Sequence, residues 1–341
     1  MSDNKRYAAI DGLRTFACIG IIAMHVLTNG KYDLGGFVFD KLIISFTNLV
    51  FLFMTISAFG MCCGYYEKFI EKKIDIVAFY KKRYLKLLPF FALLCFLDLA
   101  ISPSLDAVKE VFANLTLCFG LIPNADISVI GVGWFLGTIF VFYLMFPFFC
   151  FLLADKKRAW FAFAVSVVMH YISADYFGAN RKSIVFCFAF FMAGGLIFLY
   201  KEHLKGTAVK LISLAVFILS CVTYFLFSGS TIVMIIIGSS LLIFAVTLTD
   251  KGILVNRFTG FIGKISFEIY LCHMVVYRVL EKVRLLKVTG NDLINYIAAF
   301  IMVAVGAAVF AFIAKTVIDK VIDVMGKRIC NRSKEGVNQN G

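Results

Sequence analysis

Two polar side chains interrupt the first apolar stretch of the chain, which covers residues 10–27. Arg14 and His25 are eleven residues apart, so on an α-helix they share one face and lie about 16 Å apart along its axis. Ionisable groups within a membrane usually face a bundle interior or a water-filled path, and they usually mark function. An imidazole suits general-base catalysis near neutral pH, and a guanidinium suits a phosphate or a carboxylate. The pair therefore predicts a functional site inside a helical bundle.

The composition indicates a polytopic membrane protein. Of the 341 residues, 61% are hydrophobic and 39 are Phe, while only 16% are charged, which excludes an ordinary soluble protein. The formal net charge of +13 would suggest nucleic acid in a soluble protein, but here the basic residues flank apolar runs and set membrane orientation. The ten Cys form neither a CxxC pair nor a Cys/His metal spacing. We therefore predict no disulfide, no metal and no nucleic-acid partner.

Ten apolar runs are long enough to cross about 30 Å of hydrocarbon, so we predict an all-α bundle of ten transmembrane helices. The runs cover residues 8–28, 39–63, 84–101, 132–153, 158–173, 184–200, 208–227, 231–248, 264–281 and 292–318. The segment 102–131 holds a shorter apolar run, 111–122, which predicts a re-entrant or interfacial piece. The bundle is one domain over residues 1–326, and the polar tail 327–341 predicts disorder.

The distribution of positive charge predicts which side of the membrane each loop faces. With the N-terminus inside, 24 Lys and Arg fall in cytoplasmic segments and nine in outside segments, as expected when positive residues mark the inside. An even number of spans then places both termini in the cytoplasm. The first and ninth helices both start inside, so Arg14 and Glu268 lie toward the cytoplasm and His25 and His273 toward the outer side.

Five stretches of the chain carry motifs in a fixed order. They are IDGLRTFA…H over 10–25, FLFMTISAF over 51–59, KRYLKLLP over 82–89, WFL…FY…P over 134–147 and ISFEIYLCH over 265–273. Together they resemble the acyltransferase-3 family, the integral-membrane O-acyltransferases that modify bacterial surface glycans and related acceptors. Lys86 stands where the family pattern has an Arg, and a Lys keeps the charge but cannot form two parallel hydrogen bonds as an Arg does. Ile139 stands where many members carry a Glu. These departures leave the acceptor open.

The resemblance implies roles for the two His residues. The family's first-helix His is catalytic, so His25 is predicted to deprotonate an acceptor hydroxyl or to carry the acyl group transiently. His273 is predicted to orient His25 or to contact the acceptor, and Tyr270 faces the same way three residues earlier. The structural alternative for either His is a hydrogen bond between helices.

A second set of residues is predicted to bind the donor. Arg14, Arg83 and Lys86 carry positive charge toward the cytoplasm, which suits the phosphates of acyl-CoA. The alternative for the basic stretch around Arg83 is an anchor that touches anionic lipid. Arg14 can also pair with Asp11, three residues before it, or with Glu268 at the same depth.

Two further residues are assigned supporting roles. Ser57 lines the path through the bundle or serves as a small packing residue, and Trp134 packs and anchors at the membrane interface, with acceptor contact as a second role. We therefore predict a plasma-membrane O-acyltransferase without a cofactor, which moves an acyl group, most simply acetyl, from acyl-CoA to a surface carbohydrate such as an exopolysaccharide, capsule or O-antigen sugar.

Two other functions fit the same composition. A permease could carry an anionic solute past Arg14 without chemistry, although the chain lacks the internal repeat that many transporters show. An acyltransferase could instead modify a lipid or small molecule at the cytoplasmic face, which differs from the main prediction only in the acceptor.

Overall fold

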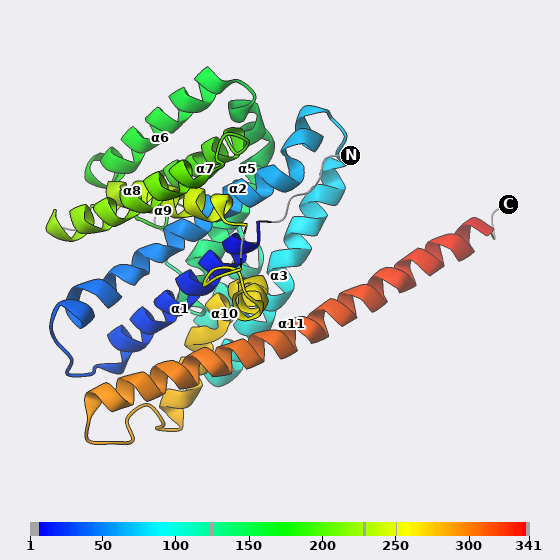
Figure 1. The fold of residues 1–341 in the computed structure, drawn as a ribbon. Helices are drawn as coiled ribbons and strands as arrows, with labels where there is room; N and C mark the ends of the chain where they lie inside the picture. The colour runs from blue at the N-terminus through cyan, green and yellow to red at the C-terminus, as the bar shows by residue number, and fades with distance from the viewer. Residues whose placement is uncertain (1–6, 123–125, 228–229, 250, 339–341) are drawn as a thin grey trace.

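The computed structural model describes residues 7–122, 126–227, 230–249 and 251–338, and the regular structure of these residues is entirely helical. The long helices are α1 (Ala8–Gly30), α2 (Leu49–Ile70), α3 (Ile76–Ile101), α4 (Leu105–Leu115), α5 (Trp134–Leu153), α6 (Lys156–Phe177), α7 (Ile184–Leu199), α8 (Thr207–Leu226), α9 (Thr231–Thr247), α10 (Arg257–Lys282) and α11 (Asp292–Asn338). α1 and α2 run through the middle of the molecule, with α6 to α9 on one side and α10 and α11 on the other (Figure 1).

Six helical segments of the described chain are long and apolar enough to cross a membrane. They are Ala8–Gly30, Val38–Ile70, Ile76–Ile101, Gly131–Leu153, Thr207–Leu226 and Asp292–Met325. α7 and α9 are apolar but shorter. Each of the ten apolar runs in the sequence is largely helical in the structure, whereas the number that cross the membrane and the side of each terminus remain predictions. α10 is less apolar because it carries Lys264 and Glu268, which both line a cavity described below.

α1 and α10 run side by side in the same direction and pack closely against each other. A Cβ on Gly263 would lie 2.2 Å from the carbonyl oxygen of Asp11, so only glycine permits this approach. The hydroxyl of Thr15 donates to the carbonyl oxygen of Thr259 at 2.9 Å, which ties the N-terminal half of α1 to the first turn of α10. Because of this packing, His25 on α1 lies beside His273 on α10, and Arg14 and Glu268 line the same cavity.

α3 begins at Ile76, ahead of residue 84, where we predicted its start. The carboxylate of Asp75 caps it by accepting hydrogen bonds from two backbone N–H groups of the first turn, at 2.9 and 3.1 Å. The basic stretch therefore lies on the helix and not before it. Arg83 consequently points into the bundle and is buried.

The second predicted span, 39–63, is not one continuous α-helix. A π-helical turn (Val38–Ile43) and a 3-10 turn (Phe46–Asn48) precede α2. Asn48, at the break, is buried, and its side-chain amide donates to the hydroxyl of Tyr224 at 2.9 Å. The break thereby holds the backbone before α2 in a fixed position beside one of the cavities.

The segment 102–131 contains α4, a 3-10 turn (Cys118–Leu121) and a loop, and it contributes no candidate span among the described residues. Glu110 on α4 accepts hydrogen bonds from the backbone N–H groups of Ser128 and Val129, at 2.6 and 2.9 Å, and from the Ser128 hydroxyl. Glu110 thus fastens the loop that leads into the 3-10 turn Gly131–Gly133 ahead of α5.

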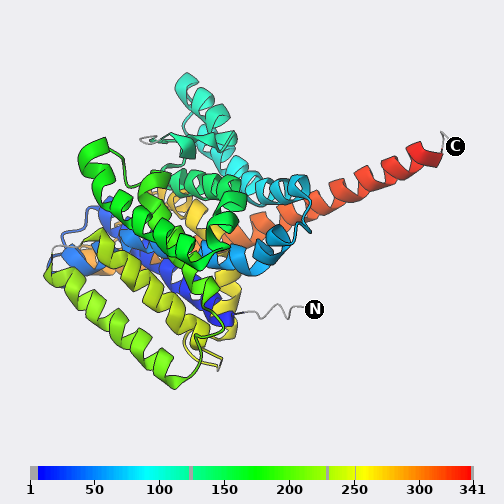
Figure 2. The ribbon, with the colours of Figure 1, turned by 90° about the horizontal axis from the view of Figure 1, so that it is seen from above.

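α11 is longer than predicted. It begins at Asp292, as expected, but continues as a helix to Asn338, through most of the tail 327–341 for which we predicted disorder. The sequence after residue 318 contains no Pro and many helix-forming residues, and Lys315 pairs with Asp319 one turn later at 4.0 Å. Figure 2 shows the end of this helix projecting away from the bundle.

Candidate functional site

A cavity of about 370 Å³ lies between α1, α2, α3, α5, α10 and α11, and we call it the inner cavity. Six of the residues selected from the sequence line it, and they are Arg14, Ser57, Arg83, Lys86, Glu268 and Tyr270. These residues come from four separate helices and are up to 256 positions apart in the chain (Arg14 to Tyr270). The fold therefore brings all three predicted donor-binding residues to one cavity, while their role remains a prediction.

Arg83 is held rigidly in the wall of the inner cavity. Its Nη2 donates to the hydroxyl of Tyr65 at 2.6 Å, and its Nη1 lies 3.5 Å from the sulfur of Met61. The guanidinium carbon lies 4.8 Å from the ring centroid of Tyr65 and 5.7 Å from that of Tyr143, distances typical of cation–π contacts. Within the described chain no carboxylate pairs with Arg83, so its charge is available to an anionic ligand.

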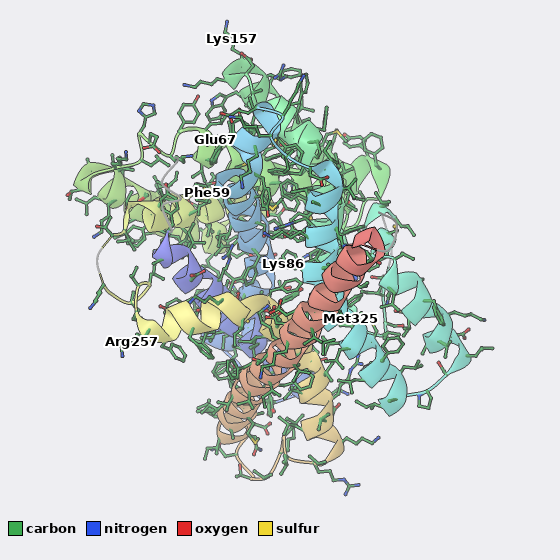
Figure 3. All side chains as sticks on the ribbon, turned by 90° about the vertical axis from the view of Figure 1, so that its right-hand side faces the viewer. Phe59, Glu67, Lys86, Lys157, Arg257 and Met325 are labelled. Atoms are coloured by element: carbon green, nitrogen blue, oxygen red, sulfur yellow. The ribbon has the colours of Figure 1, made fainter. Side chains whose placement is uncertain are left out.

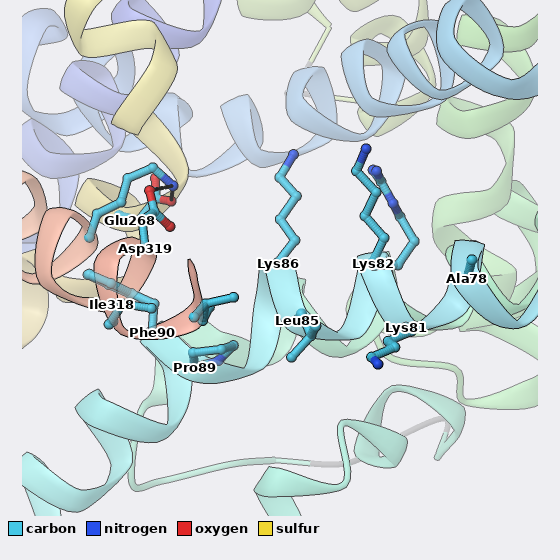
Figure 4. A pocket seen from close by; sticks show the side chains of 13 residues that line it. Ala78, Lys81, Lys82, Leu85, Lys86, Pro89, Phe90, Glu268, Ile318 and Asp319 are labelled. Atoms are coloured by element: carbon cyan, nitrogen blue, oxygen red, sulfur yellow. Dashed lines mark hydrogen bonds and ion pairs between the residues drawn. The ribbon is translucent and has the colours of Figure 1, made fainter. Parts of the chain in front are cut away.

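A second cavity, of about 470 Å³, adjoins the inner cavity, and we call it the entrance cavity. The two cavities share Arg83, Lys86, Glu268 and Lys315 in their walls. α11 crosses α3 beside Lys86 (Figure 3). In the close view, Lys82 and Lys86 point to the same side of α3 (Figure 4).

The entrance cavity is strongly basic. Five cationic residues line it against two acidic ones: the cations are Lys81, Lys82, Arg83, Lys86 and Lys315, and the acids are Glu268 and Asp319. Glu268 is buried and pairs with Lys315 at 2.6 Å. An excess of positive charge over two adjoining cavities is suited to a ligand with several phosphates.

Arg14 does not pair with Glu268, which corrects one of the two pairings considered from the sequence. Arg14 pairs with Asp11 at 3.3 Å, the other alternative, while Glu268 turns to Lys315 on α11. The sequence did not indicate Lys315 because it lies at the end of an apolar run, where a Lys is the ordinary marker of the inner membrane surface.

A third cavity, of about 250 Å³, lies beside the C-terminal half of α1, and we call it the outer cavity. Of the residues selected from the sequence, His25, Trp134 and Tyr270 line it, together with Arg181 and Lys182, which the sequence analysis did not select. Both basic residues precede α7 and resembled ordinary loop charges. Only their position in the fold distinguishes them.

His25 and His273 are neighbours across α1 and α10, with ring centroids 5.1 Å apart. His273 is completely buried and lines none of the three cavities. Its Nδ1 is 2.6 Å from the carbonyl oxygen of Tyr270, so Nδ1 carries the proton and donates it, while Nε2 has no partner among the described residues. A bare, buried Nε2 beside His25 can accept a proton or hydrogen bond from that imidazole.

Tyr270 separates the inner cavity from the outer cavity, since it is the one described residue that lines both. Its hydroxyl donates to the carbonyl oxygen of Val132 at 2.9 Å. The rings of Phe53 and Phe135 lie 6.2 and 5.4 Å from its ring centroid on the inner-cavity side. The barrier between the two cavities is therefore an aromatic layer fixed by one buried hydrogen bond.

The chain is similar to one known protein family. The family model for the acyltransferase-3 domain matches residues 7–316. This range includes every helix that lines the three cavities, except the end of α11. No curated protein and no solved structure matches the chain. Among the described residues, no group of three or more His, Cys, Asp or Glu could hold a metal ion.

Proposed function

Since this chain belongs to the acyltransferase-3 family and has several helices able to span a membrane, we propose that it is an integral-membrane O-acyltransferase of the plasma membrane. It takes an acyl group, most simply acetyl, from acyl-CoA in the cytoplasm. It transfers that group to a hydroxyl of a cell-surface carbohydrate, such as an exopolysaccharide, capsule or O-antigen sugar.

The donor occupies the entrance and inner cavities. The phosphates of CoA bind in the basic entrance cavity, where Lys82 and Lys86 point to the same side of α3. The thioester arm extends past Arg83 and Arg14 through the inner cavity as far as Tyr270, where its acyl carbonyl meets the acceptor at the border of the outer cavity. This placement is supported by the shared walls of the two cavities and by the absence of a carboxylate partner for Arg83 in the described chain.

The acceptor hydroxyl binds in the outer cavity beside His25. As its oxygen attacks the acyl carbonyl, the carbon–sulfur bond of the thioester breaks and a carbon–oxygen bond forms. His25 takes the hydroxyl proton and passes it to the CoA thiolate, with Nε2 of His273 stabilising the imidazolium in between. A two-step route, in which His25 first carries the acyl group, uses the same residues.

The observation that carries the proposal is that Tyr270 lines both the inner and the outer cavity. Donor-suited charge lies on one side of this residue and a candidate base on the other. A permease would need the same path, but it would release no CoA. Purified protein in lipid nanodiscs, supplied with a carbohydrate acceptor, should therefore release free thiol from acetyl-CoA, and gene deletion should remove an acetyl mass from the surface glycan.

Two outcomes would overturn this function. Transport of an anionic solute without thiol release would indicate the permease, and acylation of a lipid or small molecule by inside-facing sites alone would move the acceptor to the cytoplasm. Orientation is tested separately by single-cysteine labelling in a variant without native Cys. We expect positions 31 and 180 to react with an impermeant reagent in intact cells, and positions 72 and 338 only after permeabilisation.

A further inference from the structure

Arg181 is a cation in the wall of the outer cavity that the proposed reaction does not use. Its Nη2 donates to the carbonyl oxygen of Thr47 and to Oδ1 of Asn48, both at 3.2 Å. Its guanidinium carbon lies 5.0 Å from the ring centroid of Phe51. Asn48 is itself fixed by Tyr224, so Arg181 is held in one position by the break ahead of α2.

The remaining donors of Arg181 have no partner among the residues that the structure describes. A guanidinium has five N–H groups, and in the described chain only those on Nη2 make hydrogen bonds to protein. No described carboxylate forms an ion pair with it, and its unused donors are not sealed from the cavity. A fixed fork with free N–H groups is the geometry that binds a carboxylate or phosphate.

The charge of the outer cavity has the same sign throughout. No acidic residue lines it among the described residues, whereas His25, Arg181 and Lys182 do. Lys182 forms an ion pair with Asp126, which leaves Arg181 as the uncompensated cation. A partly buried cation without a counter-ion is unfavourable, and an anion that binds beside it relieves this cost. The cavity therefore favours an anion brought by its ligand.

We propose that Arg181 binds an anionic group, a carboxylate or a phosphate, on the acceptor, and that the acceptor is an acidic carbohydrate. The inference rests on the proposed function for the identity of the ligand. The 250 Å³ volume is below the range of drug-sized pockets, so one terminal sugar unit fits. Trp134, in the same wall, offers a flat apolar surface to a sugar ring, and His25 meets a hydroxyl next to the anionic group.

A binding experiment tests the charge preference without any acyl transfer. Thermal stabilisation and calorimetry of the protein in nanodiscs, without acyl-CoA, compare glucuronate, galacturonate and glucose 6-phosphate with glucose. We expect the acidic sugars to bind at least tenfold more tightly than glucose. Inorganic phosphate and acetate, tested alone, show whether the anion suffices without the sugar, and much weaker binding than the acidic sugars is expected. Equal affinity for glucuronate and glucose in the wild-type protein would overturn the proposal.

Variants of Arg181 locate the site. Arg181→Gln should abolish the preference for acidic sugars, and Arg181→Lys should retain part of it because the charge remains without the fork. Lys182→Gln is the matched control and should keep most of the preference, since Asp126 already compensates Lys182. If Arg181→Gln does not fold, Arg181→Lys gives the decisive comparison, and an unchanged preference in Arg181→Lys and Lys182→Gln alike would overturn the assignment.

The kinetic counterpart separates acceptor binding from stabilisation of the reacting oxygen. With an acidic acceptor, Arg181→Gln should raise the acceptor KM at least tenfold, with kcat and the KM for acetyl-CoA little changed. A fall in kcat that is equal for acidic and neutral acceptors would instead place Arg181 at the reacting oxygen and overturn the proposal. Thiol release from acetyl-CoA in the same samples reports the proposed function independently, so the two ideas can fail separately.

Discussion

The imidazoles of His25 and His273 lie 5.1 Å apart between ring centroids, yet of the two only His25 lines one of the three cavities. His273 is sealed behind it and is fixed by its hydrogen bond to the carbonyl oxygen of Tyr270. The two residues therefore cannot exchange roles. His25 can meet a substrate, and His273 can act only through His25.

Replacing His25 should stop catalysis without unfolding the protein. His25→Ala removes the proposed base from a half-buried position, so we expect acyl transfer to fall at least about 100-fold while expression and thermal stability stay near wild type. Thiol release and glycan acetylation measure the loss. His203→Ala, in an exposed loop, is the control and should be fully active. Near-normal activity of His25→Ala at normal expression would remove His25 from the reaction.

Replacing His273 should have a smaller and different effect. His273→Ala deletes the Nε2 acceptor behind His25, so the imidazolium form of His25 loses stabilisation and kcat should fall about tenfold. Both KM values should stay the same, because His273 touches neither cavity. A pH profile of kcat should shift as well, since His25 would lose its neighbour. A purely structural His273 would lower the amount of folded protein and leave the pH profile unmoved.

The Glu268–Lys315 pair should matter more for folding than for donor affinity. Lys315→Met leaves the buried Glu268 carboxylate without its partner, which destabilises a protein by about 3 kcal/mol or more, so expression should drop. Adding Glu268→Gln to Lys315→Met removes the uncompensated charge and should restore expression. Lys320→Met, on the exposed face of α11, is the control. If the single and double variants express equally, the ion pair has no structural role.

Much of this site could be anticipated from the sequence because membrane burial makes polar residues conspicuous. Arg14, His25, Glu268 and Tyr270 stand out in apolar runs, and the structure brings each of them to a cavity wall. The positions of these residues along their helices follow from the helical rise per residue, because α1 and α10 run in the same direction.

The remaining features depend on tertiary contacts that the sequence pattern does not contain. Arg181 and Lys315 lie at the ends of apolar runs, where a basic residue normally needs no further explanation. The Glu268–Lys315 pair depends on how α11 packs beside α10, and the position of Arg181 depends on the helix break at Asn48. A hydropathy profile of the sequence reveals neither the ion pair nor the position of Arg181.

The loop before α5 should be sensitive to acid through Glu110. Burial raises the pKa of this carboxyl, but hydrogen bonds from Ser128, Val129 and Asn114 outweigh that effect and hold it below the ordinary value of about 4.3. A lowered folded-state pKa contributes stability above the ordinary value that is lost as the pH falls through the lowered one. Limited proteolysis of the 126–130 loop should therefore accelerate in acid. Glu110→Gln should be cleaved quickly at every pH, and wild-type resistance in that variant would contradict the assignment.

Tyr270 should act as the barrier that keeps water from the donor thioester. Tyr270→Ala joins the inner and outer cavities, so acetyl-CoA should be hydrolysed in the absence of acceptor, several times faster than by the wild-type protein, while transfer to acceptor falls. Tyr270→Phe keeps the ring and loses only the 2.9 Å hydrogen bond to Val132, so it should hydrolyse little. Tyr277→Ala deletes an equally buried ring on α10 that lines none of the three cavities, and it should reduce stability without promoting hydrolysis. Thiol release without acceptor is the measurement. Equal background hydrolysis in Tyr270→Ala and Tyr277→Ala would show that the acyl group does not pass this residue.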